Sequence, residues 1–211
     1  MKKHTSLLCA LIAATAAMAL LAGGASARNI STSSQQLRAV WNPLIVTEPG
    51  GASVRCPLTL EGSFHSSTLA KVNYSLTGYI TSGSLGAPGS CTGGEGTLLT
   101  ETLPWHTRYF GFTGTLPNIS TISILVSGAA VRIRLPTGTC LFVARESTAE
   151  HILGTLNRNV TTQELTSITA GGEITSNEAC AFGLRIRARI SGTSTSFTVL
   201  NTNNRITVRL I

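Results

Sequence analysis

The sequence predicts an all-β protein, built as a single-domain antiparallel β-sandwich or a small Greek-key barrel. Apolar and polar residues alternate along Val131–Leu135, Leu184–Ile190 and Ile206–Leu210, and a period of two is typical of strands with one buried face. Clusters of Gly, Pro and Asn separate the alternating segments, as turns do in proteins with many short strands. No long segment shows the 3.6-residue period of an amphipathic helix.

The remaining elements follow from the same reasoning, taken in chain order. Segments rich in Val, Ile, Thr and Leu are bounded by turn clusters such as Glu48–Gly51 and Gly86–Gly89. They predict further strands near 37–41, 54–64, 69–80, 96–102, 109–114 and 119–126. A helix is expected around 148–156, although Gly154 weakens the helical preference of that segment. In the strand predicted over 184–190, Leu184, Ile186 and Ile190 should be buried.

Residues 1–27 have the three-part pattern of a secretory signal peptide. Lys2 and Lys3 are followed by an apolar run from Ser6 to Leu21, and Ala25-Ser26-Ala27 supplies the small residues of a cleavage site. The run is shorter than the ~20 apolar residues that span a bilayer, and no later stretch is long enough to cross as a helix. We therefore expect a secreted or cell-surface protein whose mature domain comprises residues 28–211.

Four cysteines remain after the predicted signal peptide: Cys56, Cys91, Cys140 and Cys180. An even number in an exported chain predicts two disulfides, for which three connectivities are possible. We favour Cys56–Cys91 with Cys140–Cys180, because each half of the chain then closes its own loop. No two of these cysteines have the close spacing of a zinc site, so neither a metal nor another cofactor is expected.

One segment combines residue types that bind sugars. Trp105, His106, Arg108 and Tyr109 follow Pro104 within five residues. Aromatic faces stack on the CH groups of a sugar, while Arg and His donate hydrogen bonds, so a cell-wall or extracellular polysaccharide is the partner that this cluster favours. The alternative interpretation is that Trp105 packs into the core where a strand begins.

A second candidate site is a row of arginines. Arg185, Arg187 and Arg189 would project from one face of a strand at ~7 Å intervals. In a chain with a net charge of +7, such a face could bind a polyanion. The alternative is a solvated outer face that discourages aggregation between sheet edges.

A resemblance is carried by two segments, Thr59–Ser66 (TLEGSFHS) and Glu101–His106 (ETLPWH). Both are similar to motifs in uncharacterised exported proteins of high-GC Gram-positive bacteria, and the similarity extends over about Trp41 to Leu135. The resemblance implies an exported β fold of the same kind, and it implies no activity, ligand or catalytic residue.

These observations favour a non-enzymatic extracellular or cell-surface module that binds a glycan or a polyanion, since no GxSxG or HExxH signature is present. The first alternative is a secreted hydrolase of polysaccharides or esters, which would need His106 or His65 beside Glu101, Glu61 or a serine. The second is an outer-membrane β-barrel. It is disfavoured because aromatic residues are sparse, at 5%, and because such barrels carry aromatic girdles at both interfaces.

Overall fold

The computed structural model describes residues 29–87, 89–116, 118–135, 138–144, 152–177, 180 and 184–211. The predicted signal peptide, residues 1–27, lies outside them. The described chain consists of strands with one 3-10 turn, η1 (Thr100–Thr102), and every strand pair is antiparallel. The predicted all-β class is therefore confirmed.

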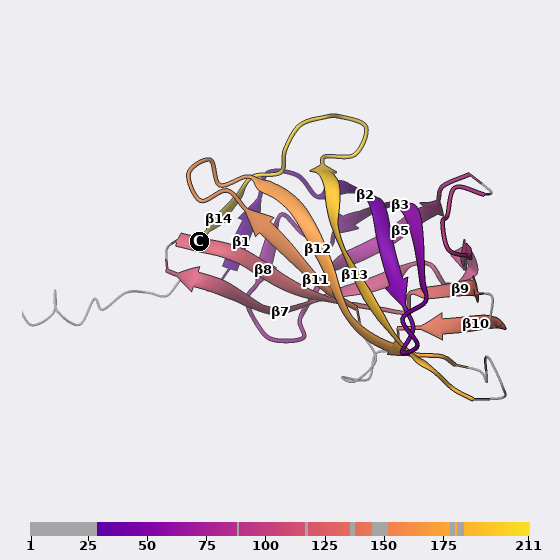
Figure 1. The fold of residues 1–211 in the computed structure, drawn as a ribbon. Helices are drawn as coiled ribbons and strands as arrows, with labels where there is room; N and C mark the ends of the chain where they lie inside the picture. Colours follow the sequence, from indigo (N-terminus) through magenta and orange to yellow (C-terminus); the bar gives the residue numbers. More distant parts are fainter. Residues whose placement is uncertain are drawn as a thin grey trace, which may run out of the picture.

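The largest sheet is a closed barrel of eight strands. Around the barrel the strands follow one another in chain order, and β13 returns to pair with β2 (Figure 1). The barrel is thus an up-and-down meander, without the crossover connection of the Greek-key form that the sequence suggested. Its strands are β2 (Gln36–Thr47), β3 (Ser53–Phe64), β5 (Leu76–Leu85), β7 (Trp105–Thr115), β8 (Asn118–Ser127), β11 (Ile152–Arg158), β12 (Leu165–Thr175) and β13 (Arg187–Thr198).

Register shifts bend the barrel wall where β2 meets β13. The pairing of β2 with β3 shifts between Trp41 and Leu44, which accommodates Pro43, a residue without an N–H to donate to the ladder. The pairing of β13 with β2 shifts between Ser191 and Ser194, where Gly192 has a φ of 142° that strongly favours glycine. Bulges of this kind increase the local twist and help a sheet to close on itself.

A small three-stranded sheet lies at each end of the barrel (Figure 1). At one end, here called the β1 end, the sheet has the order β14 (Val208–Leu210), β1 (Asn29–Thr32) and β4 (Thr68–Ala70). At the other, the β9 end, the order is β10 (Gly138–Val143), β9 (Ala130–Leu135) and β6 (Glu95–Leu98). Both sheets add buried side chains to the core of the barrel, including Ile30 and Val208 from the first and Ile133 from the second.

Both predicted disulfides are present with the predicted pairing, Cys56–Cys91 and Cys140–Cys180. Their Cα atoms are 4.3 and 4.9 Å apart. Cys56 lies on β3 and Cys140 on β10, while Cys91 and Cys180 lie in connecting segments. Each bridge therefore ties a strand to a connection at the β9 end of the barrel.

Apart from the segment 184–190, which is described below, three predicted elements differ from the structure. The segment 69–80 forms two strands, β4 and β5, because residues 71–75 turn and pair with β7 through the Tyr74 N–H and the Tyr109 carbonyl. The segment 96–102 leaves the strand after Leu98 and ends in η1. Of the predicted helix, residues 148–151 lie outside the described residues. Residues 152–156 belong to β11, since each edge of that strand pairs with a neighbour.

The prediction for 184–190 was partly wrong. Strand β13 begins at Arg187, and before it the Leu184 carbonyl accepts a hydrogen bond from the Cys180 N–H instead of one from a neighbouring strand. Leu184 is consequently 65% exposed and Ile186 only partly buried. Ile190 is buried as predicted, at 2% exposure. The predicted alternation of exposed and buried residues therefore holds from Arg185 to Ile190, and it fails at Leu184.

Candidate functional site: an apolar cavity inside the barrel

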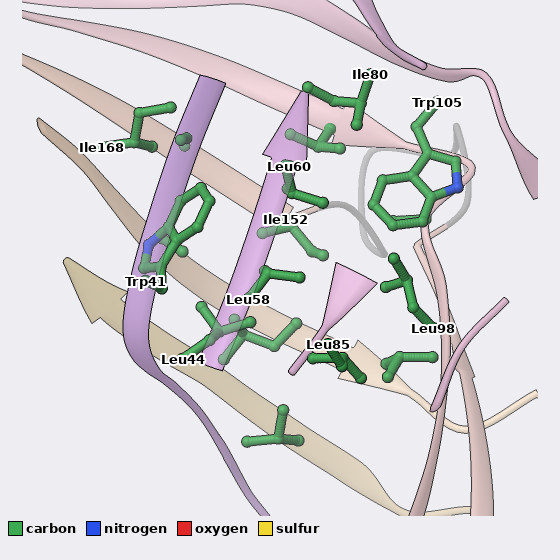
Figure 2. A pocket seen from close by; sticks show the side chains of 18 of the residues that line it. Trp41, Leu44, Leu58, Leu60, Ile80, Leu85, Leu98, Trp105, Ile152 and Ile168 are labelled. Carbon is green, nitrogen blue, oxygen red and sulfur yellow. The ribbon is translucent and has the colours of Figure 1, made fainter. Parts of the chain in front are cut away.

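The interior of the barrel contains a cavity of about 110 Å³. Inward-facing side chains from the barrel strands form its wall, and Leu98, Val131 and Ile133 of the β9-end sheet contribute at that end. Figure 2 shows the apolar side chains converging on this space from opposite walls. The larger side chains around it are Trp41, Leu44, Leu58, Leu60, Ile80, Leu85, Trp105, Ile124, Ile152, Ile168, Ile174 and Ile190.

Small residues at inward positions leave this space open. Ala170 on β12 lines the cavity together with Ala39, Ala129 and Ala130. Its partner on β11, Gly154, leaves room for the Ile124 side chain, which a Cβ at residue 154 would meet at 3.0 Å. An eight-stranded barrel is just wide enough either to be filled by side chains or to hold one small ligand. An unfilled space of this size costs roughly 2–3 kcal/mol of stability at ~24 cal/mol per Å³. The cavity is therefore a candidate site rather than ordinary core packing.

Both tryptophans of the chain line the cavity. Figure 2 shows their six-membered rings turned toward the space between them and their ring nitrogens turned away from it. The Trp105 Nε1–H donates to the Thr102 Oγ1 at 2.8 Å, whereas the Trp41 Nε1–H is buried without an acceptor among the described residues. Since both indoles contact the cavity, their fluorescence should report on its contents.

Polar groups take little part in the cavity wall. Thr107 is among the lining residues, but its hydroxyl accepts a hydrogen bond from the Thr77 Oγ1 at 2.9 Å. Cys56 also lines the space and is held in a disulfide. No carboxylate, imidazole, amine or guanidinium belongs to the wall that the described residues form. This arrangement suits the binding of an apolar molecule.

The structure does not bring the predicted sugar-binding cluster together on one surface. Successive residues of β7 point to opposite sides, so Trp105 and Tyr109 are buried inside the barrel while His106 and Arg108 lie on the outer side, half-buried. The Trp105 side chain thus packs in the core, as in the alternative interpretation. Burial also raises the pKa of the Tyr109 phenol above its usual value, because the anion would lose its hydration.

On the outer side, the two polar members of that cluster contact other groups. The His106 ring lies edge-on to Tyr79 at 5.5 Å between centroids. The Arg108 guanidinium donates to the Tyr74 carbonyl at 3.4 Å. These contacts orient both side chains along the barrel wall.

The arginines at 185, 187 and 189 are all exposed. Arg187 and Arg189 project from β13 beside Glu173 of β12. The Arg187 Nη1 is 3.5 Å from the Glu173 carboxylate, and Arg189 pairs with Glu173 in the strand register. Arg185 precedes the strand. Part of the positive charge on this face is therefore balanced by a neighbouring carboxylate.

Replacing Arg185, Arg187 and Arg189 together with serine tests whether this face binds polyanions. We expect each replacement to change stability by roughly 0.5 kcal/mol or less, as surface substitutions do. Retention on an anionic polysaccharide column should fall no further than in a charge-matched variant, in which the exposed Arg132, Arg134 and Arg209 become serine. A selective loss in the first variant, with a shallower salt dependence, would instead assign a polyanion site to the Arg185–Arg189 face.

The residues considered for hydrolysis are dispersed. The Glu61 carboxylate lies 3.6 Å from the Arg38 guanidinium on the neighbouring strand, Glu101 is exposed in η1, and His65 is exposed after β3. Among the residues that the structure describes, no three His, Cys, Asp or Glu side chains are grouped closely enough to hold a metal ion.

Fold and site together define the class of this protein: an up-and-down β-barrel of eight strands with an apolar cavity in its interior. Comparisons with protein families, with curated proteins and with solved structures give no match for this chain. Within the described residues there is no helix long and apolar enough to span a membrane.

Sequence reasoning missed the cavity. The signal that could have found it is the placement of Ala39, Gly154 and Ala170 at positions that alternate with outward residues, where Val, Ile or Leu would fill the interior. The same reasoning would have placed Trp41 and Trp105 on inward faces. Only the strand register of the closed barrel, however, shows that these positions face the same cavity.

Proposed function

We propose that this protein is an exported, non-enzymatic binding protein whose barrel takes up a small apolar molecule outside the cell. The observation that carries the proposal is the cavity of about 110 Å³, walled by aliphatic and indole side chains. Apolar surface transferred from water into such a space contributes about 25 cal/mol per Å² to binding. The proposal places the ligand between Trp41 and Trp105.

The size of the cavity limits the ligand. A protein cavity of ~150 Å³ lined by Leu, Ile and Phe stays dry and binds benzene or xenon. A space of about 110 Å³ accordingly suits a molecule with a single small ring or a short branched chain. The absence of charged groups from the described wall disfavours ionic ligands, since a charge there would lose its hydration without gaining a partner.

Two features support export. The pattern of residues 1–27 is that of a signal peptide, and the two disulfides join all four cysteines of the remaining chain. Disulfides persist in oxidising environments, such as the outside of the cell. A glycan ligand at residues 105–109 is less well supported than an apolar one, because the Trp105 and Tyr109 rings are buried and cannot stack on a sugar at the surface.

Titration of the mature protein with toluene tests the proposal. We expect a saturable change in tryptophan emission and a rise in Tm with toluene concentration, because a ligand that binds only the folded state stabilises it. Ala170→Leu should abolish both responses, since Ala170 lines the cavity and a larger side chain there takes up part of its volume.

The matched control is Gly171→Ala, at the next residue along β12. Gly171 points away from the cavity, and a Cβ there meets no atom within 4 Å. This variant should respond to toluene as the wild type does. A non-saturating response of the wild type, or saturable binding that survives Ala170→Leu, would show that the cavity is not the site.

A further inference from the structure

Exposed apolar side chains gather at the β1 end of the barrel. Val72 is 63% exposed, Tyr74 and Phe110 are each 42% exposed, and Phe112 and Leu116 are 38% and 42% exposed. They come from the turn between β4 and β5 and from the β7–β8 hairpin. We call these five residues the rim patch. Single exposed apolar residues are normal, but a group of them marks an interaction surface.

Contacts between the two segments join the aromatic residues of the rim patch. The Tyr74 and Phe110 rings lie edge to face with centroids 6.2 Å apart, and the Lys71 Nζ lies 5.5 Å from the centre of the Phe112 ring. The backbone holds the turn against β7, since the Tyr74 N–H donates to the Tyr109 carbonyl at 2.7 Å and the Tyr109 N–H donates to the Ser75 carbonyl at 2.8 Å.

Tyr74 is held in an unusual backbone conformation. Its φ is 63°, in the left-handed region that non-glycine residues seldom adopt. The hydrogen bond from Arg108 to the Tyr74 carbonyl helps to keep it there. In this conformation a large ring packs against Phe110 at the surface rather than in the core. Backbone strain of this kind persists where the surroundings enforce it, and it concentrates at functional positions.

Charge is distributed unevenly between the two ends of the barrel. Described residues at or next to the β1 end include five cations, Lys71, Arg108, Arg158, Arg205 and Arg209, and the carboxylate of Glu164, while Arg38 and Glu61 nearby pair with each other at 3.6 Å. Toward the β9 end the described carboxylates of Glu48, Glu95, Glu101 and Glu173 are accompanied by six arginines, Arg55, Arg132, Arg134, Arg185, Arg187 and Arg189. The apolar rim thus has Lys71 and Arg108 in direct contact and lies at the end of the barrel with fewer carboxylates.

Arg158 and Arg209 add a basic hollow at the same end. They line a depression of about 530 Å³ together with Thr161, Thr162 and Gln163. The Arg158 Nε–H is buried and lacks a hydrogen-bond partner within the described chain. Burial also lowers the pKa of this guanidinium from its usual value. An anionic group entering the hollow would supply the missing acceptor.

We propose that the β1 end docks on the surface of an anionic lipid bilayer. Aromatic and aliphatic side chains enter the boundary between headgroups and acyl chains, and nearby Lys and Arg side chains are attracted to anionic lipids. Tyr and Phe rings suit this boundary because it is apolar on one side and wet on the other. The inference does not depend on the ligand proposed for the barrel.

Cosedimentation of the mature protein with lipid vesicles tests the docking. We expect binding to vesicles of phosphatidylcholine mixed with phosphatidylglycerol, weaker binding to phosphatidylcholine alone, and a loss of binding as salt rises. The double variant Phe110→Ser, Phe112→Ser should bind the anionic vesicles at least about tenfold more weakly, because it removes two apolar anchors. Lys71→Ser should weaken binding less and reduce its salt dependence.

The matched control is Leu184→Ser, which removes a 65% exposed apolar side chain at the opposite end of the barrel. It should bind as the wild type does, and tryptophan emission should confirm that all variants are folded. Absence of wild-type binding, equal binding to neutral vesicles, or an equal loss in the Leu184 control would each overturn the proposal. Self-association of the wild type that the double Phe variant abolishes, without vesicle binding, would assign the rim patch to a protein partner instead.

Discussion

Replacement of Ile190 with aspartate is expected to unfold the barrel, or to lower its free energy of unfolding by more than about 3 kcal/mol. Ile190 is 2% exposed, pairs with Gly172 and Val46 on the two neighbouring strands, and faces the apolar cavity. An aspartate there would place a carboxylate among side chains that cannot pair with it. Denaturation by urea, followed by tryptophan emission, measures the loss.

Two comparison variants make this prediction specific. Arg189→Ser alters the preceding, exposed residue of the same strand and should change stability by roughly 0.5 kcal/mol or less. Ile186→Asp should cost less than Ile190→Asp, because Ile186 lies before the strand and is only partly buried. A wild-type urea midpoint for Ile190→Asp would show that residue 190 does not face the interior.

Removal of either disulfide should have the second largest effect. The bridges close loops with sequence separations of 35 and 40 residues. Loops of that length correspond to about 4 kcal/mol each in the chain-entropy treatment, and measured effects are commonly about 2–4 kcal/mol. We expect losses in that range for the pair Cys56→Ser, Cys91→Ser and for the pair Cys140→Ser, Cys180→Ser, measured by urea denaturation without reductant.

The location of the two disulfides predicts which part of the barrel is destabilised when they are reduced. Both lie at the β9 end, so amide hydrogen exchange should accelerate first in β6, β9 and β10 when the protein is reduced. Reduced wild-type protein should have the same amide exchange rates and the same stability as a variant that lacks all four cysteines. Uniform acceleration around the barrel, or unchanged stability on full reduction, would contradict the stabilising role assigned to the bridges.

The sequence alone was sufficient for the local features. The alternation in Val131–Leu135 predicted a strand, and β9 lies there. The four cysteines led to the observed pairing, because two sequential loops are compatible with a chain that adds its strands in order. Such features depend on residue spacing within one segment. Alternation with a period of two shows which face of a strand is buried, whatever the position of that strand in the fold.

Only the tertiary structure decided the closure of the barrel and the contents of its interior. The pairing of β13 with β2 joins Ile190 to Val46, far away in the sequence, and nothing within either segment specifies its partner or register. A shift of one residue would exchange inward and outward faces along a whole strand. That register places Trp105 inside and His106 outside, and it turns Ala39 and Ala170 toward the interior, where both line the cavity. The cavity and the rim patch are both products of pairing between distant segments, because each is assembled from several strands that meet only when the sheet closes.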